Sequence, residues 1–236
     1  MSNIRLFYSK SLSLNLIDKL DKSQSHYVSK VMRIKENKVF SLFNNSGEWE
    51  AKILTISKSL VEFNITKQLR QKENDKELWL AFSPIKSNYF NFMIQKATEL
   101  GVTKFFPIVF ERSIVRKINK DRLQKIIIEA SEQSNRINIP EIKNLKNLSE
   151  FLKNFPDNGN LIFCDINSRK EKIDTVLSKK RKGAICILIG PEGDFSEIER
   201  QSIIDIKQST ALSLAHNILR SETAAIAAIS IINFHL

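Results

Sequence analysis

Two short stretches of the sequence combine residue types that suit ligand binding, and the first is a glycine-rich loop. Residues 190–193, which read GPEG, follow a run of six apolar residues (184–189) and precede the capping-box pair Ser196 and Glu199. A loop in this position lies at the carboxyl end of a buried strand, where Gly190 and Gly193 let its backbone approach a ligand closely. The alternative is a tight strand-to-helix turn that needs glycine only for its backbone angles.

The second stretch is the polar group Arg220-Ser221-Glu222-Thr223, which interrupts an apolar tail. The following residues, 224–232, are apolar almost all round, so we expect a buried helix that begins near Glu222 at the same edge of the fold. Arg220 would then direct a fixed cation into a dry cleft. The alternative is an arginine that pairs with Glu222 or binds loop carbonyls.

Apolar strands and amphipathic helices alternate over the last two thirds of the chain. The strands are expected at residues 78–82, 104–109, 161–164, 185–189 and 211–214, and the helices near residues 88–100, 120–134, 173–179, 198–206 and 222–234. This alternation predicts an α/β fold with a parallel sheet covered on both faces. Ligands bind outside the carboxyl ends of such strands. No GxGxxG or P-loop motif is present, and we expect no acidic residue at a strand end to hold a ribose.

The first part of the chain has a different pattern, with short strands expected at residues 5–8, 38–43, 48–56 and 60–65 and one helix near residues 23–31. The charged run 67–77 resembles an exposed linker. We therefore predict a small β domain over residues 1–68, a linker over 69–77 and an α/β domain over 78–236.

Charge and cysteine content narrow the class of protein. There are 37 Lys and Arg against 26 Asp and Glu, which gives a net charge of +11 and favours a polyanionic partner such as nucleic acid, although solubility is an alternative reason for the charge. Cys164 and Cys186 lie in apolar runs without paired spacing, which argues against a disulfide scaffold, a zinc site or a redox pair. The sequence has neither a signal peptide nor an apolar run long enough to cross a bilayer, so we expect a cytoplasmic protein without a membrane anchor.

The two stretches together resemble a known pair of motifs. LIGPEGDFSEIE (188–199) and LSLAHNILRSETAAIAA (212–228) are similar to the signature pair of the SPOUT-class RNA methyltransferases, specifically the RsmE family of 16S rRNA uridine N3-methyltransferases. The resemblance extends to residues 5–7, 31–33, 94–102, 107–113, 132–136 and 139–142. It implies a PUA-like β-barrel, a catalytic domain with a deep trefoil knot, and a homodimer. It further implies S-adenosylmethionine as cofactor, no metal, and 16S rRNA or the assembled small ribosomal subunit as partner.

The resemblance also implies roles for individual residues. Arg220 is the catalytic candidate, and Glu192 and Glu222 are weaker candidates for orienting groups. The expected cofactor-binding residues are Leu188, Ile189, Gly190, Pro191, Glu192, Gly193, Leu212, Leu214, Ile218, Leu219 and Thr223. The expected RNA-binding residues are Lys30, Arg33, Lys86, Arg112 and Arg136.

The sequence departs from the family pattern at three positions. Ala215 stands where the family usually has the glycine of its second motif, Asn135 stands where glycine precedes Arg136, and Asp194 stands where a second glycine often follows GPEG.

Two other functions remain open at this stage. One is a SPOUT enzyme that methylates a ribose 2′-oxygen of tRNA or rRNA, and the other is a non-catalytic RNA-binding assembly factor that has kept the fold. Methylation at a ring carbon would need an activated cysteine, and neither Cys164 nor Cys186 has a basic neighbour in the sequence. This favours a nitrogen or ribose oxygen as the methyl acceptor.

Overall fold

The strands of the chain form two separate sheets, which belong to two units. The computed structural model describes residues 4–58, 60–72, 76–168 and 182–235. The small unit comprises Met1–Asn74 together with Ser131–Ile139, and the large unit comprises Asp75–Ala130 and Pro140–Leu236. The segment 131–139 therefore packs with the small unit although it lies far along the chain, and the predicted domain limits stay a prediction.

The small unit is built on a five-stranded sheet in the order β1-β3-β4-β5-β2. Its strands are β1 (Arg5–Phe7), β2 (Ile17–Lys19), β3 (Val39–Asn44), β4 (Gly47–Ser57) and β5 (Leu60–Gln71). Alternate residues such as Ile53, Phe63 and Ile65 are fully buried, as expected when one face of a sheet covers a core. Gly47 has a φ of +127°, so the turn between β3 and β4 depends on glycine.

Two details of this unit differ from the sequence prediction. The expected helix at 23–31 is present, but it consists of α1 (Lys22–His26) followed by a π-helical turn, η1 (Tyr27–Val31). The run 67–77 is not a linker throughout, because β5 continues to Gln71 and pairs there with Gly47 of β4. The polar composition of this run predicted exposure correctly but not the main-chain pairing with the long strand β4.

Buried charges attach the segment 131–139 to the sheet of the small unit. Arg5 pairs with Glu48 at 3.1 Å, and both side chains are only 8% exposed. The Arg5 guanidinium also donates to the carbonyls of Ser131 (3.0 Å) and Arg136 (2.5 Å), while Arg70 donates to the carbonyl of Asn135 at 3.1 Å. The main chain of this segment is thus fixed by two arginines from β1 and β5.

The large unit contains a parallel sheet in the order β12-β10-β11-β6-β7-β8, with β9 paired to β7. Its strands are β6 (Leu78–Phe82), β7 (Lys104–Val109), β8 (Glu141–Ile142), β9 (Lys146–Asn147), β10 (Asn160–Cys164), β11 (Ile185–Ile189) and β12 (Ser209–Leu212). Every residue of β11 is buried, which confirms the central strand expected from its apolar sequence.

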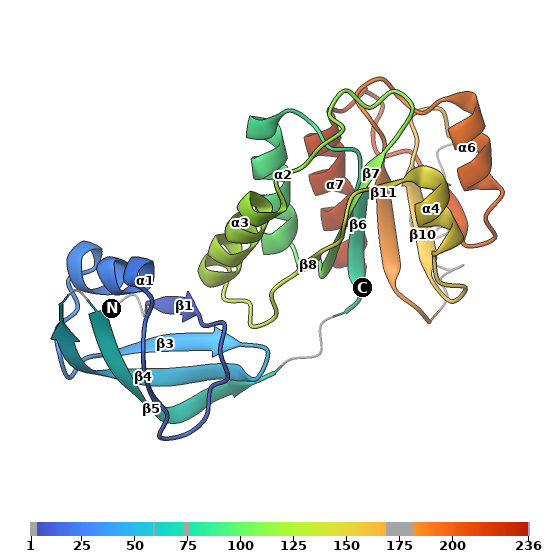
Figure 1. Cartoon of the computed structure of the whole chain (residues 1–236). Helices are drawn as coiled ribbons and strands as arrows, with labels where there is room; N and C mark the ends of the chain where they lie inside the picture. Colours follow the sequence, from blue (N-terminus) through green and yellow to red (C-terminus); the bar gives the residue numbers. More distant parts are fainter. Residues whose placement is uncertain (1–3, 59, 73–75, 169–181, 236) are drawn as a thin grey trace. The chain divides into compact units, whose positions relative to one another are not determined.

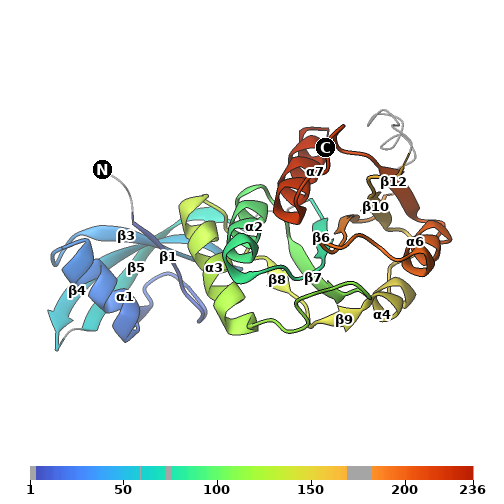
Figure 2. The ribbon, with the colours of Figure 1, turned by 90° about the horizontal axis from the view of Figure 1, so that it is seen from above.

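Helices cover both faces of this sheet. Figures 1 and 2 show α2 (Ser87–Glu99) and α7 (Ser221–Phe234) on one face and α4 (Leu148–Lys153) and α6 (Glu197–Ile204) on the other. The α4 and α6 side packs a phenylalanine-rich core against β10 and β11 that includes Phe151, Phe163 and Phe195. The α/β architecture is therefore as predicted.

A few elements of the large unit were missed or shifted. The short elements β8, β9 and α4 were not predicted, and β12 lies at 209–212 instead of 211–214. The helix α3 (Lys120–Gln133) agrees with the prediction. The helix expected at 173–179 lies outside the described residues.

Candidate functional site

The site lies at the edge of the parallel sheet where the strands end. The chain adds β7 and β8 on one side of β6, and then β10, β11 and β12 on the other side. In open sheets of this kind, ligands bind outside the carboxyl ends of the strands. The segments after β10, β11 and β12 all begin at this edge.

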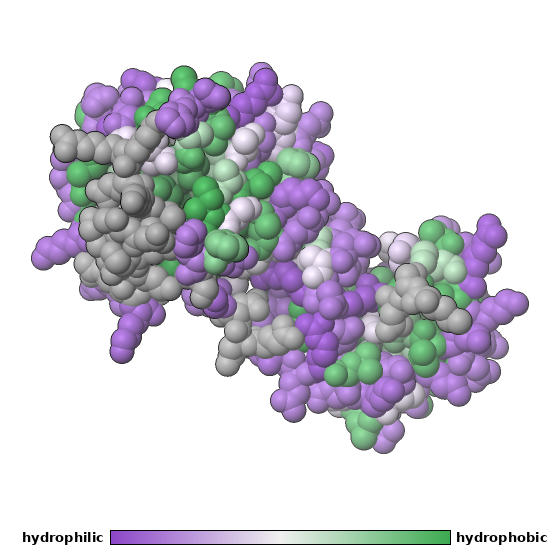
Figure 3. All heavy atoms as spheres, turned by 180° about the vertical axis from the view of Figure 1, so that it is seen from behind, coloured by the Kyte–Doolittle hydropathy of each residue, from purple (hydrophilic) through white to green (hydrophobic). Residues whose placement is uncertain are grey.

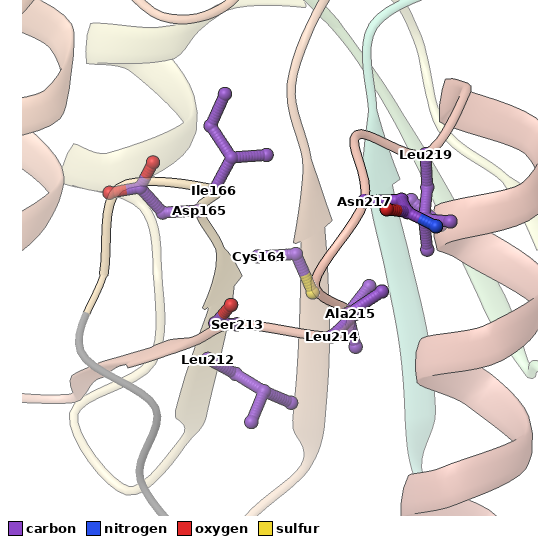
Figure 4. Close-up of a pocket in the computed structure, with 10 residues that line it drawn as sticks. Cys164, Asp165, Ile166, Leu212, Ser213, Leu214, Ala215, Asn217 and Leu219 are labelled. Atoms are coloured by element: carbon purple, nitrogen blue, oxygen red, sulfur yellow. The ribbon is translucent and has the colours of Figure 1, made fainter.

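A pocket at this edge is lined by three segments of the large unit. The lining consists of small and apolar side chains with a few polar groups, namely Cys164, Asp165, Ile166, Leu212, Ser213, Leu214, Ala215, Asn217, Leu219 and Ala224. In Figure 4 the Cys164 thiol is directed toward Leu214 and Ala215, whereas the Asp165 carboxylate points away from them. Apolar walls with few polar groups are typical of sites for small organic ligands.

The structure brings only some of the predicted cofactor residues to this pocket. Leu212, Leu214 and Leu219 line it. Among the others, Leu188 and Ile189 are buried in β11, whereas Ile218 is 81% exposed. The loop 190–193 meets the second motif through a 3.4 Å hydrogen bond from the Ser221 hydroxyl to the Gly190 carbonyl.

An acidic residue that the sequence motifs do not mark follows a strand at this edge. Asp165 follows β10 directly, is 6% exposed and lines the pocket. Its carboxylate forms an ion pair with Arg200 of α6 and accepts from the Asn167 main-chain N–H at 3.1 Å. The sequence prediction missed it because no motif marks the residue after β10.

The two glycines of the loop 190–193 differ in how closely protein atoms surround them. A Cβ atom added to Gly190 would lie 2.6 Å from the ring of Phe195, so packing against this ring excludes a larger residue. One added to Gly193 would lie 3.3 Å from Cβ of Arg112, a contact that a small shift relieves. Neither glycine has a positive φ, so the alternative that this turn needs glycine for its backbone angles is wrong, while close approach of a ligand stays a prediction.

Side chains from two directions hold this loop. Arg112, which was predicted to contact RNA, donates to the carbonyls of Gly193 (3.2 Å) and Phe195 (3.3 Å). The capping box of α6 is confirmed, because Glu199 accepts from the Ser196 main-chain N–H at 3.0 Å and Ser196 accepts from the Glu199 main-chain N–H at 3.4 Å. Protein groups on both sides therefore fix the shape of this loop.

Two of the three departures from the family pattern fall where the backbone is left-handed. Asn135 has a φ of +61° and Asp194 has a φ of +63°. Asparagine and aspartate are the residues other than glycine that adopt this conformation most readily. These substitutions for glycine therefore preserve the local backbone. Ala215 does not have a positive φ.

Arg220 is the N-cap residue of α7, and its side chain is exposed. Its guanidinium lies over the ring of Tyr89 on α2, 5.5 Å from the ring centroid. The expected dry cleft around Arg220 is therefore absent in the isolated chain. No ion pair between Arg220 and Glu222 occurs among the described residues, although Glu222 itself is buried.

The helix α7 is buried on one face only, although its apolar composition predicted burial all round. Ala225, Ala228, Ile229 and Ile232 are fully buried. The remaining apolar positions are partly or fully exposed, and Phe234 is 88% exposed. Within the described residues, α7 therefore packs along one face and leaves apolar side chains exposed on the other.

The two cysteines are held as thiols by their surroundings. Burial raises the pKa of Cys164 to about 12, and burial also raises the pKa of Cys186 well above its usual range. A thiol with such a pKa is not ionised at neutral pH and is a weak nucleophile. The Cys164 thiol in the pocket wall therefore serves as a packing group.

The predicted RNA contacts lie in different parts of the chain. Lys30 and Arg33 are exposed at and just after η1 in the small unit, near the exposed side chains of Tyr27, Val31 and Met32. Arg136 belongs to the segment attached to that unit. In the large unit, Lys86 is exposed at the start of α2. In the view of Figure 3, hydrophilic side chains predominate on the small unit, whereas the large unit also shows hydrophobic side chains.

Within the part of the chain that the structure describes, no helix has the length and apolar character needed to span a membrane. The same residues contain no group of three or more His, Cys, Asp or Glu side chains placed to hold a metal ion.

Comparison with known proteins identifies relatives over the whole length. Residues 72–233 match the family described as RNA methyltransferase domain, and residues 20–66 match the RNA methyltransferase PUA domain. Ribosomal RNA small subunit methyltransferase E of Rickettsia conorii is 35% identical over 207 residues, which cover 87% of this chain and 84% of the relative. The protein of the same name from Buchnera aphidicola is 33% identical and covers 96% of this chain and 94% of the relative.

A solved structure has a similar fold over nearly the whole chain. The crystal structure of ribosomal RNA small subunit methyltransferase E from Neisseria gonorrhoeae bound to S-adenosyl methionine superposes with a TM-score of 0.89 at 29% identity. The match covers 99% of this chain and 98% of that chain. The predicted fold class is thus confirmed, while the knot stays a prediction.

Proposed function

The chain belongs to the RNA methyltransferase family, and we propose that it transfers a methyl group from S-adenosylmethionine to N3 of a uridine in the 16S rRNA of the small ribosomal subunit. The observation that carries this proposal is the pocket at the carboxyl ends of β10 and β12, which the second signature stretch lines. Two relatives over nearly the whole chain are named as small-subunit rRNA methyltransferases, and the similar solved structure binds S-adenosyl methionine.

The residues of the pocket fit this cofactor in their chemistry. Leu212, Leu214 and Leu219 provide apolar surface for a nucleoside base, and the small side chains of Ala215 and Ala224 leave room beside it. Ser213 and Asn217 add polar groups to the same lining. When bound, the cofactor supplies an electrophilic methyl group, and the protein has to align the acceptor with it and exclude water.

Arg220 is the proposed catalytic residue. When N3 of uracil loses its proton, negative charge spreads onto the two carbonyl oxygens, and a nearby guanidinium stabilises that charge more in the transition state than in the ground state. Because Arg220 is exposed in the isolated chain, the bound RNA has to displace water from it. Its position over Tyr89 limits the directions in which the guanidinium extends.

The thiols of the large unit argue against a ring carbon as the methyl acceptor. Methylation at a ring carbon needs a thiolate that adds to the pyrimidine, and burial keeps the pKa of Cys164 at about 12. The pocket therefore offers no ionised thiol at neutral pH. Methylation of a ribose 2′-oxygen remains an outcome that the experiment below distinguishes.

We further infer a cytoplasmic homodimer that binds RNA through its basic surface. The exposed cations Lys30 and Arg33 in the small unit suit phosphate groups. The exposed side of α7, with Phe234 88% exposed, suits a second copy of the chain, and Tyr89 and Phe92 on the adjacent helix α2 extend this apolar surface. No step of the reaction requires a metal ion.

The test is single-turnover methylation of small ribosomal subunits that lack the modification. We expect 3-methyluridine as the product, and the Arg220→Ala variant should react roughly a hundredfold more slowly, since removing one positioned charge partner costs about 3 kcal/mol of transition-state stabilisation. Binding of S-adenosylmethionine should change much less. The Arg220→Lys variant measures how much of the effect is charge alone.

Each alternative has its own result. A 2′-O-methylated nucleoside as the product would show that the acceptor is the ribose oxygen and not N3. An absence of S-adenosylmethionine binding by the parent protein would favour a non-catalytic assembly factor. Near-parental rates for Arg220→Ala would refute the catalytic role. A collapsed melting temperature of that variant would indicate a structural role instead.

A further inference from the structure

One largely covered arginine of α6, Arg200, contacts two aspartates that belong to different loops. It forms an ion pair with Asp165, the residue after β10, and a second ion pair with Asp194 at 2.9 Å. Asp194 follows the loop 190–193 directly. The Arg200 side chain is 12% exposed, and the Asp165 side chain is 5% exposed. Arg200 therefore ties the segment after β10 to the loop after β11.

Asp165 connects this ion-pair cluster to the pocket. It lines the pocket beside Cys164 and Ile166, but its carboxylate points away from Leu214 and Ala215. The carboxylate is thus used to fix the pocket wall and not to face a ligand. Further contacts fix the same wall, because the Ser168 hydroxyl donates to the Asp165 carbonyl at 2.9 Å.

Asp194 connects the cluster to the loop 190–193. Its carboxylate accepts from the main-chain N–H of Phe195 at 2.8 Å as well as from Arg200. Its backbone has a φ of +63°, a conformation that glycine adopts without strain and aspartate adopts at some cost. The ion pair with Arg200 offsets that cost, which gives a reason for aspartate at this position.

The electrostatic balance of the cluster keeps Arg200 charged. Burial by itself lowers the pKa of a guanidinium, but the hydrogen bond and the charge of Asp165, followed by the charge of Asp194, raise the pKa of Arg200 above its usual value. Breaking a buried pair of this kind leaves an uncompensated charge, which is strongly unfavourable. The two loops therefore do not separate easily in the folded chain.

We propose that Arg200 is a positioning residue for the cofactor site, which holds the segment after β10 and the loop after β11 in the binding conformation before S-adenosylmethionine arrives. This inference rests on the proposed function of the pocket. A site that is already formed loses less conformational freedom on binding, so its affinity is higher than that of a mobile site. Arg200 itself does not line the pocket.

The test compares S-adenosylmethionine binding by calorimetry and steady-state methylation kinetics for the parent and for single variants. For Arg200→Met and Asp165→Asn we expect the Kd and the KM for the cofactor to rise about tenfold, as coupling within such networks suggests. The KM for the RNA substrate should stay near the parental value, because the changes do not touch exposed basic residues. Arg200→Lys should recover only part of the affinity, since one ammonium group does not span two carboxylates as a guanidinium does.

Two further variants keep the inference open to refutation if Arg200→Met does not fold. Asp194→Gly removes one carboxylate at a backbone angle that suits glycine, so it should fold and bind the cofactor a few times more weakly. Glu197→Gln is the matched control: Glu197 is 89% exposed and 3.9 Å from the Arg200 Nε, so its loss should leave the Kd unchanged.

The results separate this inference from the proposed function. Parental Kd values in both Asp165→Asn and Asp194→Gly would overturn the positioning role. A parent protein that does not bind S-adenosylmethionine would instead overturn the assignment of the pocket. An equal loss in Glu197→Gln would show that general charge, and not the buried pairs, controls the affinity.

Discussion

Arg5 in the small unit and Arg200 in the large unit both hold loops by buried charge, but their partners differ. In the Arg5 cluster, formed by Arg5, Glu48 and Arg70, two arginines share one carboxylate. In the Arg200 cluster, formed by Arg200, Asp165 and Asp194, one arginine lies between two carboxylates. The first cluster has a surplus of donors and the second has a surplus of acceptors.

This difference determines which main-chain atoms form hydrogen bonds with each cluster. The surplus N–H groups of Arg5 and Arg70 bind the main-chain carbonyls of Ser131, Arg136 and Asn135. The surplus carboxylate oxygens of the Arg200 cluster accept instead from main-chain N–H groups, including that of Phe195. In both clusters, main-chain groups pair with the side-chain groups that the ion pairs leave over. Side chains of either charge can therefore hold a loop through its main chain, whatever the sequence of that loop.

The pKa values of the two arginines differ in the same sense as the numbers of carboxylates around them. Burial lowers the pKa of Arg5, and the attraction of Glu48 does not fully oppose it. Around Arg200 the carboxylates outweigh burial, and the pKa is raised. Removing Arg5 should therefore take a charged donor away from main-chain carbonyls, whereas removing Arg200 should leave two carboxylates without their shared cation.

The largest expected effect is on the stability of the small unit. Arg5→Met removes one of the two cationic partners of the buried Glu48 and the side-chain hydrogen bonds to the carbonyls of Ser131 and Arg136, which should cost about 3–5 kcal/mol of the free energy of unfolding. Arg70→Met should cost less, because the Arg70 side chain is 31% exposed. Thermal and urea unfolding of the two variants provide the measurement. Equal losses would show that burial does not distinguish the two arginines.

An intermediate effect on stability is expected in the loop 190–193 of the large unit. There packing, and not charge, determines which residue fits at position 190. Gly190→Ala places a Cβ atom 2.6 Å from the ring of Phe195, so the ring or the loop has to move. Overpacking of this kind costs about 1–3 kcal/mol. Gly193→Ala is the control, since its Cβ would lie 3.3 Å from Arg112 Cβ at an exposed position. If Gly190→Ala melts like the parent, the packing explanation for this glycine is wrong.

The smallest effect should come from an exposed ion pair in the small unit. Hydrogen bonds from Lys10 and Tyr8 lower the pKa of Asp18 to about 2 from an ordinary value of 3.8. Because the folded-state pKa is lowered, the stabilisation is present above about pH 4 and is lost as the pH falls toward 2. Asp18→Asn should therefore lower stability by less than about 1 kcal/mol at pH 7, and the difference should shrink on acidification. A difference that grows toward pH 2 would contradict this sign.

Much of the candidate site could be predicted from local sequence, and the remainder could not. The loop 190–193, its capping box and the strand β11 each depend on neighbouring residues, so their patterns were readable. Asp165 gave no signal, because its role depends on Arg200, a residue on another element. The exposure of Arg220 was also missed, since an apolar flanking sequence says nothing about which side of a helix start is covered.

The sequence by itself determined the alternation of strands and helices, the central buried strand and the family resemblance, because each depends on residues that are contiguous in the chain. Only the tertiary structure decided that 131–139 packs with the small unit, that β5 continues to Gln71, and that Arg200 joins two loops of the pocket edge. These features depend on pairs of residues that are distant along the chain. Their energies arise from burial and charge balance, which exist only once the chain has folded.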